Sequence, residues 1–447
     1  MIAFERWISM KKFIVCLSLI SGLLASVGGA AQTPPPPRTV TLEEAVTTVL
    51  ARNQFLKEAE DTVAVFEARV EQSRSRLLPQ VRADLGYSRL IPTEEIAIPG
   101  FGVFQLFPAN NYDFHAGVSQ LVYDFNRTKE AVNLSRSQVE SAADRWEILR
   151  RDLAFQTSQL FDSILFLQDD IRVQGETVKT LGDHLAEATK KLEAGTATEL
   201  EVLGTQVRLV NAQNQVVDLN DALEKQMLAL RRLMGIEDQA PLELRGEFTY
   251  EPQALDPEGL VREAGQKRPE TKAVQDMIRS ADIQIHVAEL SDRPSLSVNV
   301  LAGWKNGYLP DLDVWKLNYV AAVQANVPIF NGNLARSMKA EAEANLQTLR
   351  DRDKDVEGMI RMEVLQAAAD VKAAAQKLES VKINVTRAAK ALEYAKSRYE
   401  VGTVSNLDLQ DTEDAYSQAE LVRLQALYQF VLSKLALQRA VGNPLTK

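Results

Sequence analysis

Acidic and hydroxyl side chains that follow two glycines form the clearest chemical pattern in this 447-residue chain. Thr198-x-x-Glu201 and Ser405-x-x-Asp408 each match a capping box, in which a hydroxyl and an acid satisfy free amides at a helix N-terminus. Asp411 lies one helical turn beyond Asp408 and has no such capping role. The pattern predicts two helix starts, and it leaves Asp411 either as part of a charged site or as an ordinary surface acid.

Side chains that could carry catalysis or bind a metal do not occur at useful spacings. The histidines, His115, His184 and His286, are far apart and match no zinc-binding motif. There is no G-x-S-x-G and no phosphate-binding loop, and the glycines at 100 and 102 are better explained by loop flexibility. Cys16, the single cysteine, lies in an N-terminal apolar run, so the rest of the chain has no disulfide or thiolate site. We therefore predict that the protein is not an enzyme and has no cofactor or metal.

The first 31 residues are predicted to be a signal peptide, with translation starting at Met1 or Met10. Basic residues precede an apolar run over residues 13–24, and small residues follow it up to Ala31. The run is shorter than the roughly 20 residues that a membrane-spanning helix needs. Removing the segment takes the net charge from −10 to −12, because it carries three basic side chains and one acid. Such an acidic chain is a poor partner for nucleic acid, whereas its charge suits a lumen that attracts cations.

A constant offset of 207 residues relates two copies of one pattern. It pairs Gly195 with Gly402, Thr196 with Thr403, Gly235 with Gly442 and Tyr123 with Phe330. The offset holds over more than a hundred residues without an insertion. We therefore predict a single domain over residues 32–447 that is duplicated internally, with repeats over about 41–240 and 256–445.

Two long intervals without proline predict unusually long helices. The first interval allows one helix over residues 128–194, roughly 100 Å long at 1.5 Å per residue, and the second allows a similar helix over residues 334–401. Each reverses, near 195–199 and near 402–406, into a returning helix of about 35 residues. A shorter helical pattern runs over residues 41–78 and stops at a proline.

Helices of this length imply coiled-coil packing rather than a compact core. The returning helix of the first repeat carries apolar residues at the 3-4-3 spacing of a coiled-coil seam. These residues are Leu200, Leu203, Val207 and Val210.

Alternation of apolar and polar residues predicts four strands, near 80–89, 112–122, 295–304 and 315–327. Their length, about ten residues, is that of membrane β-strands. The stretch between the first two is rich in proline and glycine and is predicted to be a long loop. Four strands cannot close a membrane barrel, for which about eight are the minimum, and open edges in lipid are costly. Other copies of the chain must complete the barrel; two or three would suffice, and the long helices favour three.

These features, in this order, resemble the TolC-type outer-membrane efflux proteins over residues 40–445. The matching motifs are TLEEAV near the start, prolines before two strands, VPIFNGN with its partner LVYDFN, and RYEVGTVSNLDLQD with its partner GTATELEVL. The resemblance implies a mixed α and β membrane protein with internally duplicated long α-helical hairpins and four transmembrane β-strands per chain. Its homotrimer would form a 12-stranded β-barrel in outer-membrane lipid, continuous with an α-helical tunnel that projects into the periplasm.

The resemblance also implies partners and a function. The protein would be the passive exit duct of a tripartite efflux pump, docked to a periplasmic adaptor (membrane fusion) protein and an inner-membrane transporter, and would export small molecules. Two alternatives stay open: the exit duct of a type I protein secretion system, and a periplasmic coiled-coil adaptor or scaffold. The sequence does not identify the substrate or the transporter.

Residue by residue, the resemblance assigns a gate to the helical tips. Asp408 and Asp411 match two ring aspartates that make the entrance selective for cations. Tyr399 matches a latch tyrosine, and Glu201 matches the acidic partner of that tyrosine. Val404 departs from the pattern, because the best-known gate of the family has an arginine there; no salt bridge from this position is possible.

Two further groups complete the predicted sites. By resemblance, Gly195, Thr196, Gly402 and Thr403 line the tip that docks the adaptor, although turn glycines alone would also explain the first and third. Aromatic residues near the strand ends fit a membrane-interface girdle, with packing in the loop core as the alternative. They are Tyr87, Tyr112, Trp304, Tyr308 and Trp315.

Overall fold

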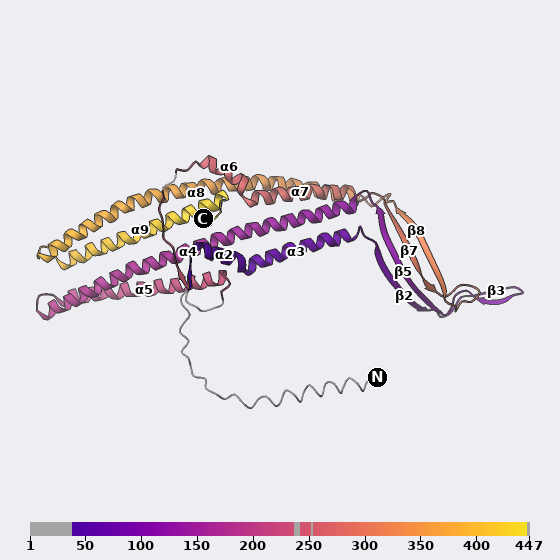
Figure 1. Ribbon diagram of the computed structural model, residues 1–447, viewed down its shortest axis with the longest axis horizontal. Helices are drawn as coiled ribbons and strands as arrows, with labels where there is room; N and C mark the ends of the chain where they lie inside the picture. Colours follow the sequence, from indigo (N-terminus) through magenta and orange to yellow (C-terminus); the bar gives the residue numbers. More distant parts are fainter. Residues whose placement is uncertain (1–37, 237–241, 252–253, 445–447) are drawn as a thin grey trace, which may run out of the picture. The chain divides into compact units, whose positions relative to one another are not determined.

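The computed structural model describes residues 38–236, 242–251 and 254–444, so the predicted signal peptide lies outside the described residues. The chain divides into two units. The smaller comprises Met1–Thr39 and Asp238–Glu243, and the larger comprises Val40–Glu237 and Leu244–Lys447. Short strands β1 (Arg38–Val40) and β6 (Leu242–Leu244) pair with each other. All other elements belong to the larger unit, which is shown in Figure 1.

The larger unit contains two matching sets of helices. The first set is α2 (Leu42–Arg52), α3 (Gln54–Ser75), α4 (Arg127–Glu193) and α5 (Glu199–Leu233). The second set is α6 (Pro257–Lys267), α7 (Pro269–Glu289), α8 (Leu334–Glu400) and α9 (Asn406–Val441). Both α4 and α8 have 67 residues. Pairs α4–α5 and α8–α9 form two long hairpins, whose turns lie at the opposite end of this unit from the strands (Figure 1).

The predicted helix over residues 41–78 is wrong in one respect, because it is broken at Asn53. The backbone of Asn53 is extended, with φ −64° and ψ 128°. Its side-chain oxygen accepts from the amide of Phe55 at 3.0 Å, and its side-chain nitrogen donates to the carbonyl of Leu233 at 3.1 Å. The second bond reaches a residue 180 positions away, so no local pattern could have shown it.

Both 67-residue helices begin at an asparagine in the left-handed conformation. Asn126 has φ 65° and Asn333 has φ 65°, and they are equivalent under the 207-residue offset. Asparagine tolerates this conformation better than other residues that carry a side chain. Each asparagine turns the chain from the end of the sheet into a long helix.

Four strands form one antiparallel sheet in the order β2-β5-β7-β8. They are β2 (Gln80–Arg89), β5 (Asn110–Tyr123), β7 (Ser295–Lys305) and β8 (Lys316–Asn326). The register places Leu85, Phe114, Trp304 and Leu317 in one row of the same face. The next row, on the other face, is Asp84, His115, Gly303 and Asn318. Strands β2 and β8 are the two edges, and neither has a second partner strand among the described residues.

The predicted long loop between the first two strands is wrong, because it contains a hairpin. Strands β3 (Glu95–Ile98) and β4 (Gly102–Gln105) pair antiparallel around a turn at Gly100. Each has only four residues, and the surrounding prolines and glycines hid the alternation in the sequence. This hairpin lies beyond the ends of the other strands in Figure 1.

One apolar cluster packs between α6, α7, α8 and α9, and many of its buried residues are alanine. The predicted coiled-coil seam on α5 is not buried within the chain. Leu200 is 80% exposed, and the other three seam residues are at least 47% exposed. No helix of the described residues is both long enough and apolar enough to cross a membrane.

Candidate functional site

The two helical tips are exposed turns with the same geometry. Gly195 has φ 73° and Gly402 has φ 74°, a region that side-chain-bearing residues avoid. The amide of Thr196 donates to the carbonyl of Lys191 at 2.8 Å, and the amide of Thr403 makes the equivalent bond at 3.0 Å. Each threonine hydroxyl donates to the same carbonyl as its own amide. The four tip residues predicted from the sequence therefore form two matching turns, closed by backbone hydrogen bonds.

Only one of the two predicted capping boxes is complete. Ser405 and Asp408 form both reciprocal bonds, with the Asp408 amide donating at 3.1 Å and the Ser405 amide donating back at 3.3 Å. At the other tip, the Glu201 amide donates to the Thr198 hydroxyl at 3.3 Å, without the return bond. Asp408 is thus an exposed capping residue, and the Glu201 carboxylate stays available for another contact.

The structure gives Tyr399 a different partner from the predicted one. Its hydroxyl accepts from Lys191 Nζ at 2.5 Å and donates to Glu187 at 3.2 Å, and Lys191 also lies against its ring. Within the described chain Tyr399 has no hydrogen bond to Glu201, so this predicted pairing is not formed between residues of one copy. The contact joins the last turns of α8 and α4, and it lowers the pKa of Glu187, mainly through the hydrogen bond from Lys191.

Asp411 is paired with a cation that was not predicted from the sequence. Arg208 on α5 lies 3.4 Å from Asp411 and 3.3 Å from Asp414 on α9. Burial raises the pKa of Asp414, and the charge of Asp411 adds to this, whereas Arg208 opposes it. Arg208 follows Val207 of the seam, and nothing in its local sequence indicated a partner about 200 residues away. The acids near the tip are therefore partly neutralised.

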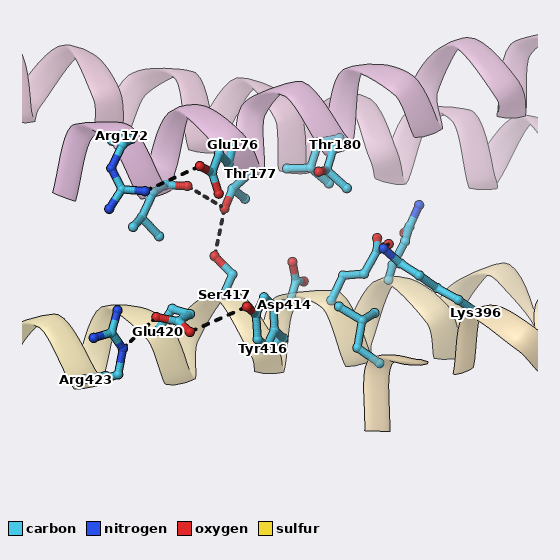
Figure 2. Close-up of a pocket in the computed structure, with 15 residues that line it drawn as sticks. Arg172, Glu176, Thr177, Thr180, Lys396, Asp414, Tyr416, Ser417, Glu420 and Arg423 are labelled. Carbon is cyan, nitrogen blue, oxygen red and sulfur yellow. Dashed lines mark hydrogen bonds and ion pairs between the residues drawn. The ribbon is translucent and has the colours of Figure 1, made fainter. Parts of the chain in front are cut away.

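Further hydrogen bonds join the two hairpins slightly farther from the turns. His184 on α4 and Glu413 on α9 are 2.6 Å apart. The Thr177 and Ser417 hydroxyls are 2.7 Å apart (Figure 2). A cavity of about 360 Å³ lies beside these pairs, between α4, α8 and α9. Its wall is mixed in charge, with Arg172, Lys396, Arg423, Glu176, Glu413 and Glu420 among the lining residues.

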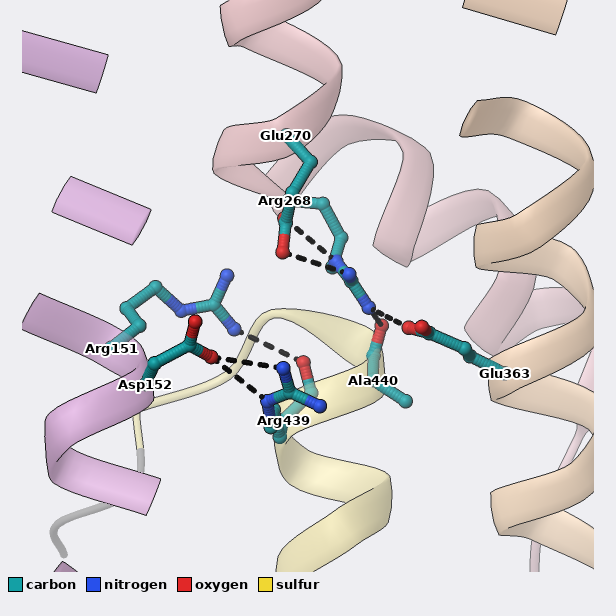
Figure 3. A network of polar contacts seen from close by, with 7 residues as sticks. All are labelled: Arg151, Asp152, Arg268, Glu270, Glu363, Arg439 and Ala440. Atoms are coloured by element: carbon teal, nitrogen blue, oxygen red, sulfur yellow. Dashed lines mark hydrogen bonds and ion pairs between the residues drawn. The ribbon is translucent and has the colours of Figure 1, made fainter. Parts of the chain in front are cut away.

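Far from the tips, a buried arginine network fixes the end of α9. The Arg268 side chain is only 3% exposed. It forms a bidentate ion pair with Glu270 and donates to Glu363 at 2.6 Å. It also donates to the carbonyl of Ala440 (Figure 3). Arg439 pairs with Asp152 of α4 at 2.9 Å. Cations at the C-terminal end of a helix complement its dipole. The network ties α9 to α4, α7 and α8.

The predicted interface aromatics lie near the loop end of the sheet. Tyr112 stacks on Trp315 at 5.2 Å and lies 5.2 Å from Tyr87, and Phe114 stacks on Trp315 at 5.0 Å. Trp304 lies two rows further in, opposite Phe114, and is 55% exposed. A second aromatic group was missed, at the helix end of the sheet. It comprises Tyr123, Phe125 and Phe330, all exposed.

The two faces of the sheet differ in chemistry. One exposes large apolar side chains, among them Leu85, Leu317 and Tyr319. The other carries a polar cluster in which His115 contacts Asp113 and Asn318, and Lys305 lies 3.7 Å from Asp113. No group of three or more metal-ligating side chains that could hold an ion occurs among the described residues.

Comparison with known proteins agrees with this arrangement. Residues 45–236 and 260–443 match the family model for outer membrane efflux proteins. The chain belongs to the outer membrane efflux protein family. It is 23% identical to outer membrane protein TolC of Vibrio cholerae over 87% of both chains. It is 24% identical to the probable efflux pump outer membrane protein TtgC of Pseudomonas putida, over 90% of this chain and 83% of the relative.

Solved structures show the same fold for this outer membrane efflux protein. The outer membrane channel CmeC of Campylobacter jejuni superposes with a TM-score of 0.77 at 17% identity, over 90% of this chain and 85% of that one. The predicted TolC-type family and the outer-membrane location are thus confirmed, and the periplasmic adaptor or scaffold alternative is set aside.

Proposed function

We propose that this outer membrane efflux protein is the passive exit duct of a tripartite pump that exports small molecules. It works as a homotrimer, with a periplasmic adaptor protein and an inner-membrane transporter as partners. The transporter supplies the energy. Three copies contribute four strands each to one twelve-stranded barrel, and the long helices continue it as a tunnel.

The open sheet is the observation that carries this proposal. Its edges, β2 and β8, run in opposite directions, so the β8 edge of one copy can pair antiparallel with the β2 edge of the next. Unpaired edges in hydrocarbon would each leave a row of backbone groups without partners, at several kcal/mol per group. The apolar face then meets outer-membrane lipid, and the polar face around His115 lines the pore. Tyr87, Tyr112, Trp304 and Trp315 serve as the aromatic girdle.

The helical tips are the periplasmic entrance in this proposal. Gly195, Thr196, Gly402 and Thr403 dock the adaptor through backbone and small side chains. Tyr399 holds the resting state by its contact with Lys191 and Glu187, and Glu201 is free to pair with a neighbouring copy. Val404 takes no part in a salt bridge.

Asp408 and Asp411 make the entrance selective for cations. Three copies of each acid in a narrow aperture concentrate negative potential. Because Arg208 lies 3.4 Å from Asp411, it lowers that potential, and its removal is expected to increase selectivity. The exported class is small molecules rather than protein, in keeping with the efflux relative TtgC.

Planar-bilayer recording of the purified protein tests the duct and its entrance together. We expect small cation-selective channels, weaker cation preference in Asp408→Ala/Asp411→Ala, and stronger preference in Arg208→Gln. Asp353→Ala/Asp355→Ala, which removes two acids of α8 far from the tip, is the matched control and should behave as wild type. Absence of channels from folded, membrane-inserted trimers would contradict the duct. Unchanged selectivity in both tip variants would contradict the role of the acidic entrance but not the duct itself.

A further inference from the structure

The β3–β4 hairpin exposes an apolar surface that the chain itself does not cover. Phe101 at its turn is 78% exposed, and Ile96, Ile98, Val103 and Phe104 are each at least 43% exposed. The apolar residues occupy both faces, since Ile96 pairs with Phe104 and Ala97 pairs with Val103. An isolated two-stranded hairpin is only marginally stable in water, so this one needs a partner surface.

The position of the hairpin argues against lipid as that partner. It extends beyond the strand ends (Figure 1), past the aromatic stack of Tyr87, Tyr112 and Trp315. Such aromatic residues mark the boundary between hydrocarbon and water, so the hairpin lies on the aqueous side. Its only charged side chains, Glu94 and Glu95, would also be repelled by an anionic lipid surface.

Sheet topology brings a matching surface to the hairpin. The hairpin follows β2, one edge of the sheet, whereas the connection over residues 306–315 precedes β8, the other edge. When β2 of one copy pairs with β8 of the next, these two loops become neighbours. The connection exposes Leu309 (63%) and Val314 (51%), two apolar side chains whose contact with water is unfavourable.

The connection is held in a fixed position, as a docking surface should be. The Asn306 side chain is buried; it accepts from the amide of Tyr112 at 2.8 Å and donates to the carbonyl of Asn110 at 2.7 Å. Charges are complementary at the same place. Arg89, the last residue of β2, would approach Asp311 and Asp313 of the neighbouring connection.

We propose that the β3–β4 hairpin is a clasp between subunits, which packs its apolar residues onto the 306–315 connection of the next copy. This inference rests on the trimer of the proposed function and adds a specific partner surface to it. The clasp strengthens the barrel at its outer end, where the strand edges alone would join the copies. Each trimer has three clasps.

Cysteine cross-linking tests the clasp directly, because the only natural cysteine, Cys16, lies in the predicted signal peptide. Phe101→Cys/Leu309→Cys in the full chain should give covalent dimers and trimers on oxidation, and either single variant should give none. Disulfide-linked dimers from Phe101→Cys alone would show that the hairpins meet one another, and would overturn the assigned partner. A label on Phe101→Cys that becomes buried only in lipopolysaccharide vesicles, without cross-linking, would assign the surface to lipid.

Trimer stability gives a second readout that does not depend on cysteine geometry. In Phe101→Ser/Val103→Ser/Phe104→Ser, we expect the trimer to dissociate in detergent at a temperature about 10 °C lower, with single-channel conductance unchanged. Glu94→Gln/Glu95→Gln is the matched control on the same hairpin. The clasp would be overturned if the triple-serine trimer dissociated at the wild-type temperature and the double-cysteine variant gave no cross-link. The proposed exit duct would not be affected by that result. Failure of wild type to trimerise would instead overturn the proposed function.

Discussion

His184 on α4 and Glu413 on α9 form a hydrogen bond of 2.6 Å, which joins the two hairpins that carry the two tips. Both side chains are nearly buried, at 12% and 13% exposed. Asp183 and Glu187 on α4 add negative charge near the imidazole, and Lys396 on α8 lies 3.7 Å from Glu413. The hydrogen bond to Glu413 is the main cause that raises the pKa of His184. This bond makes the association of the hairpins dependent on pH.

The direction of the pH dependence follows from the raised pKa of His184. Because the pKa is raised in the folded state, the stabilisation is complete below the ordinary histidine value of about 6.5 and is lost as pH rises through the raised value. We expect channel activity in planar bilayers to increase as the pH rises above the ordinary histidine value of about 6.5. His184→Gln keeps a neutral donor and should remove this dependence. The same pH profile in both proteins would contradict the role of His184.

Tyr399 is expected to hold the tips of α8 and α4 together. Tyr399→Phe keeps the ring but removes the hydroxyl that contacts Lys191 and Glu187. At about 0.5 kcal/mol for each of these two exposed hydrogen bonds, the loss of about 1 kcal/mol corresponds to a roughly fivefold higher ratio of open to closed channels. Single-channel recording measures this ratio. Tyr394→Phe, an exposed tyrosine on the same helix, is the control, and an equal effect there would contradict the specific contact.

Asp162 is a buried acid on α4 between Phe161 and Ile164, and burial raises its pKa to about 7. Since the folded-state pKa is raised, the native state loses stability as pH increases towards 7. Asp162→Asn should therefore change stability little near pH 4 and stabilise by up to about 4 kcal/mol at pH 8. Thermal unfolding followed by circular dichroism at both values measures the difference. A gain that does not vary with pH would show that the carboxylate is not the cause.

Arg268 is expected to be essential for the stability of the network around α9. Arg268→Met leaves Glu270 and Glu363 without their buried cation, a loss of about 3–5 kcal/mol for a broken buried pair. Arg361→Met is the matched control, because its bidentate pair with Glu258 is exposed and should contribute at most about 1 kcal/mol. Denaturation in detergent compares the two. Equal losses of stability in the two variants would mean that the burial of Arg268 does not make its ion pairs more important than an exposed pair.

Features that depend on short-range rules could be predicted from the amino-acid sequence. Long intervals without proline predict the 67-residue helices, because proline is the residue that a helix interior excludes. Alternation with period two predicts the strands and their faces. The 207-residue offset places the tip glycines at equivalent positions, and both have the positive φ that only glycine adopts at little cost.

Which side chains contact each other across the two hairpins became visible in the three-dimensional fold. Arg208 with Asp411 and Tyr399 with Lys191 are pairs about 200 residues apart. Their contact depends on how two hairpins are rotated and shifted against each other, and no local pattern contains that information. The break at Asn53 and the β3–β4 hairpin were missed for related reasons: the first depends partly on the distant carbonyl of Leu233, and the second has strands too short for a clear period. Helices and strands depend on neighbours along the chain, whereas the contacts near the two tips depend on neighbours in space.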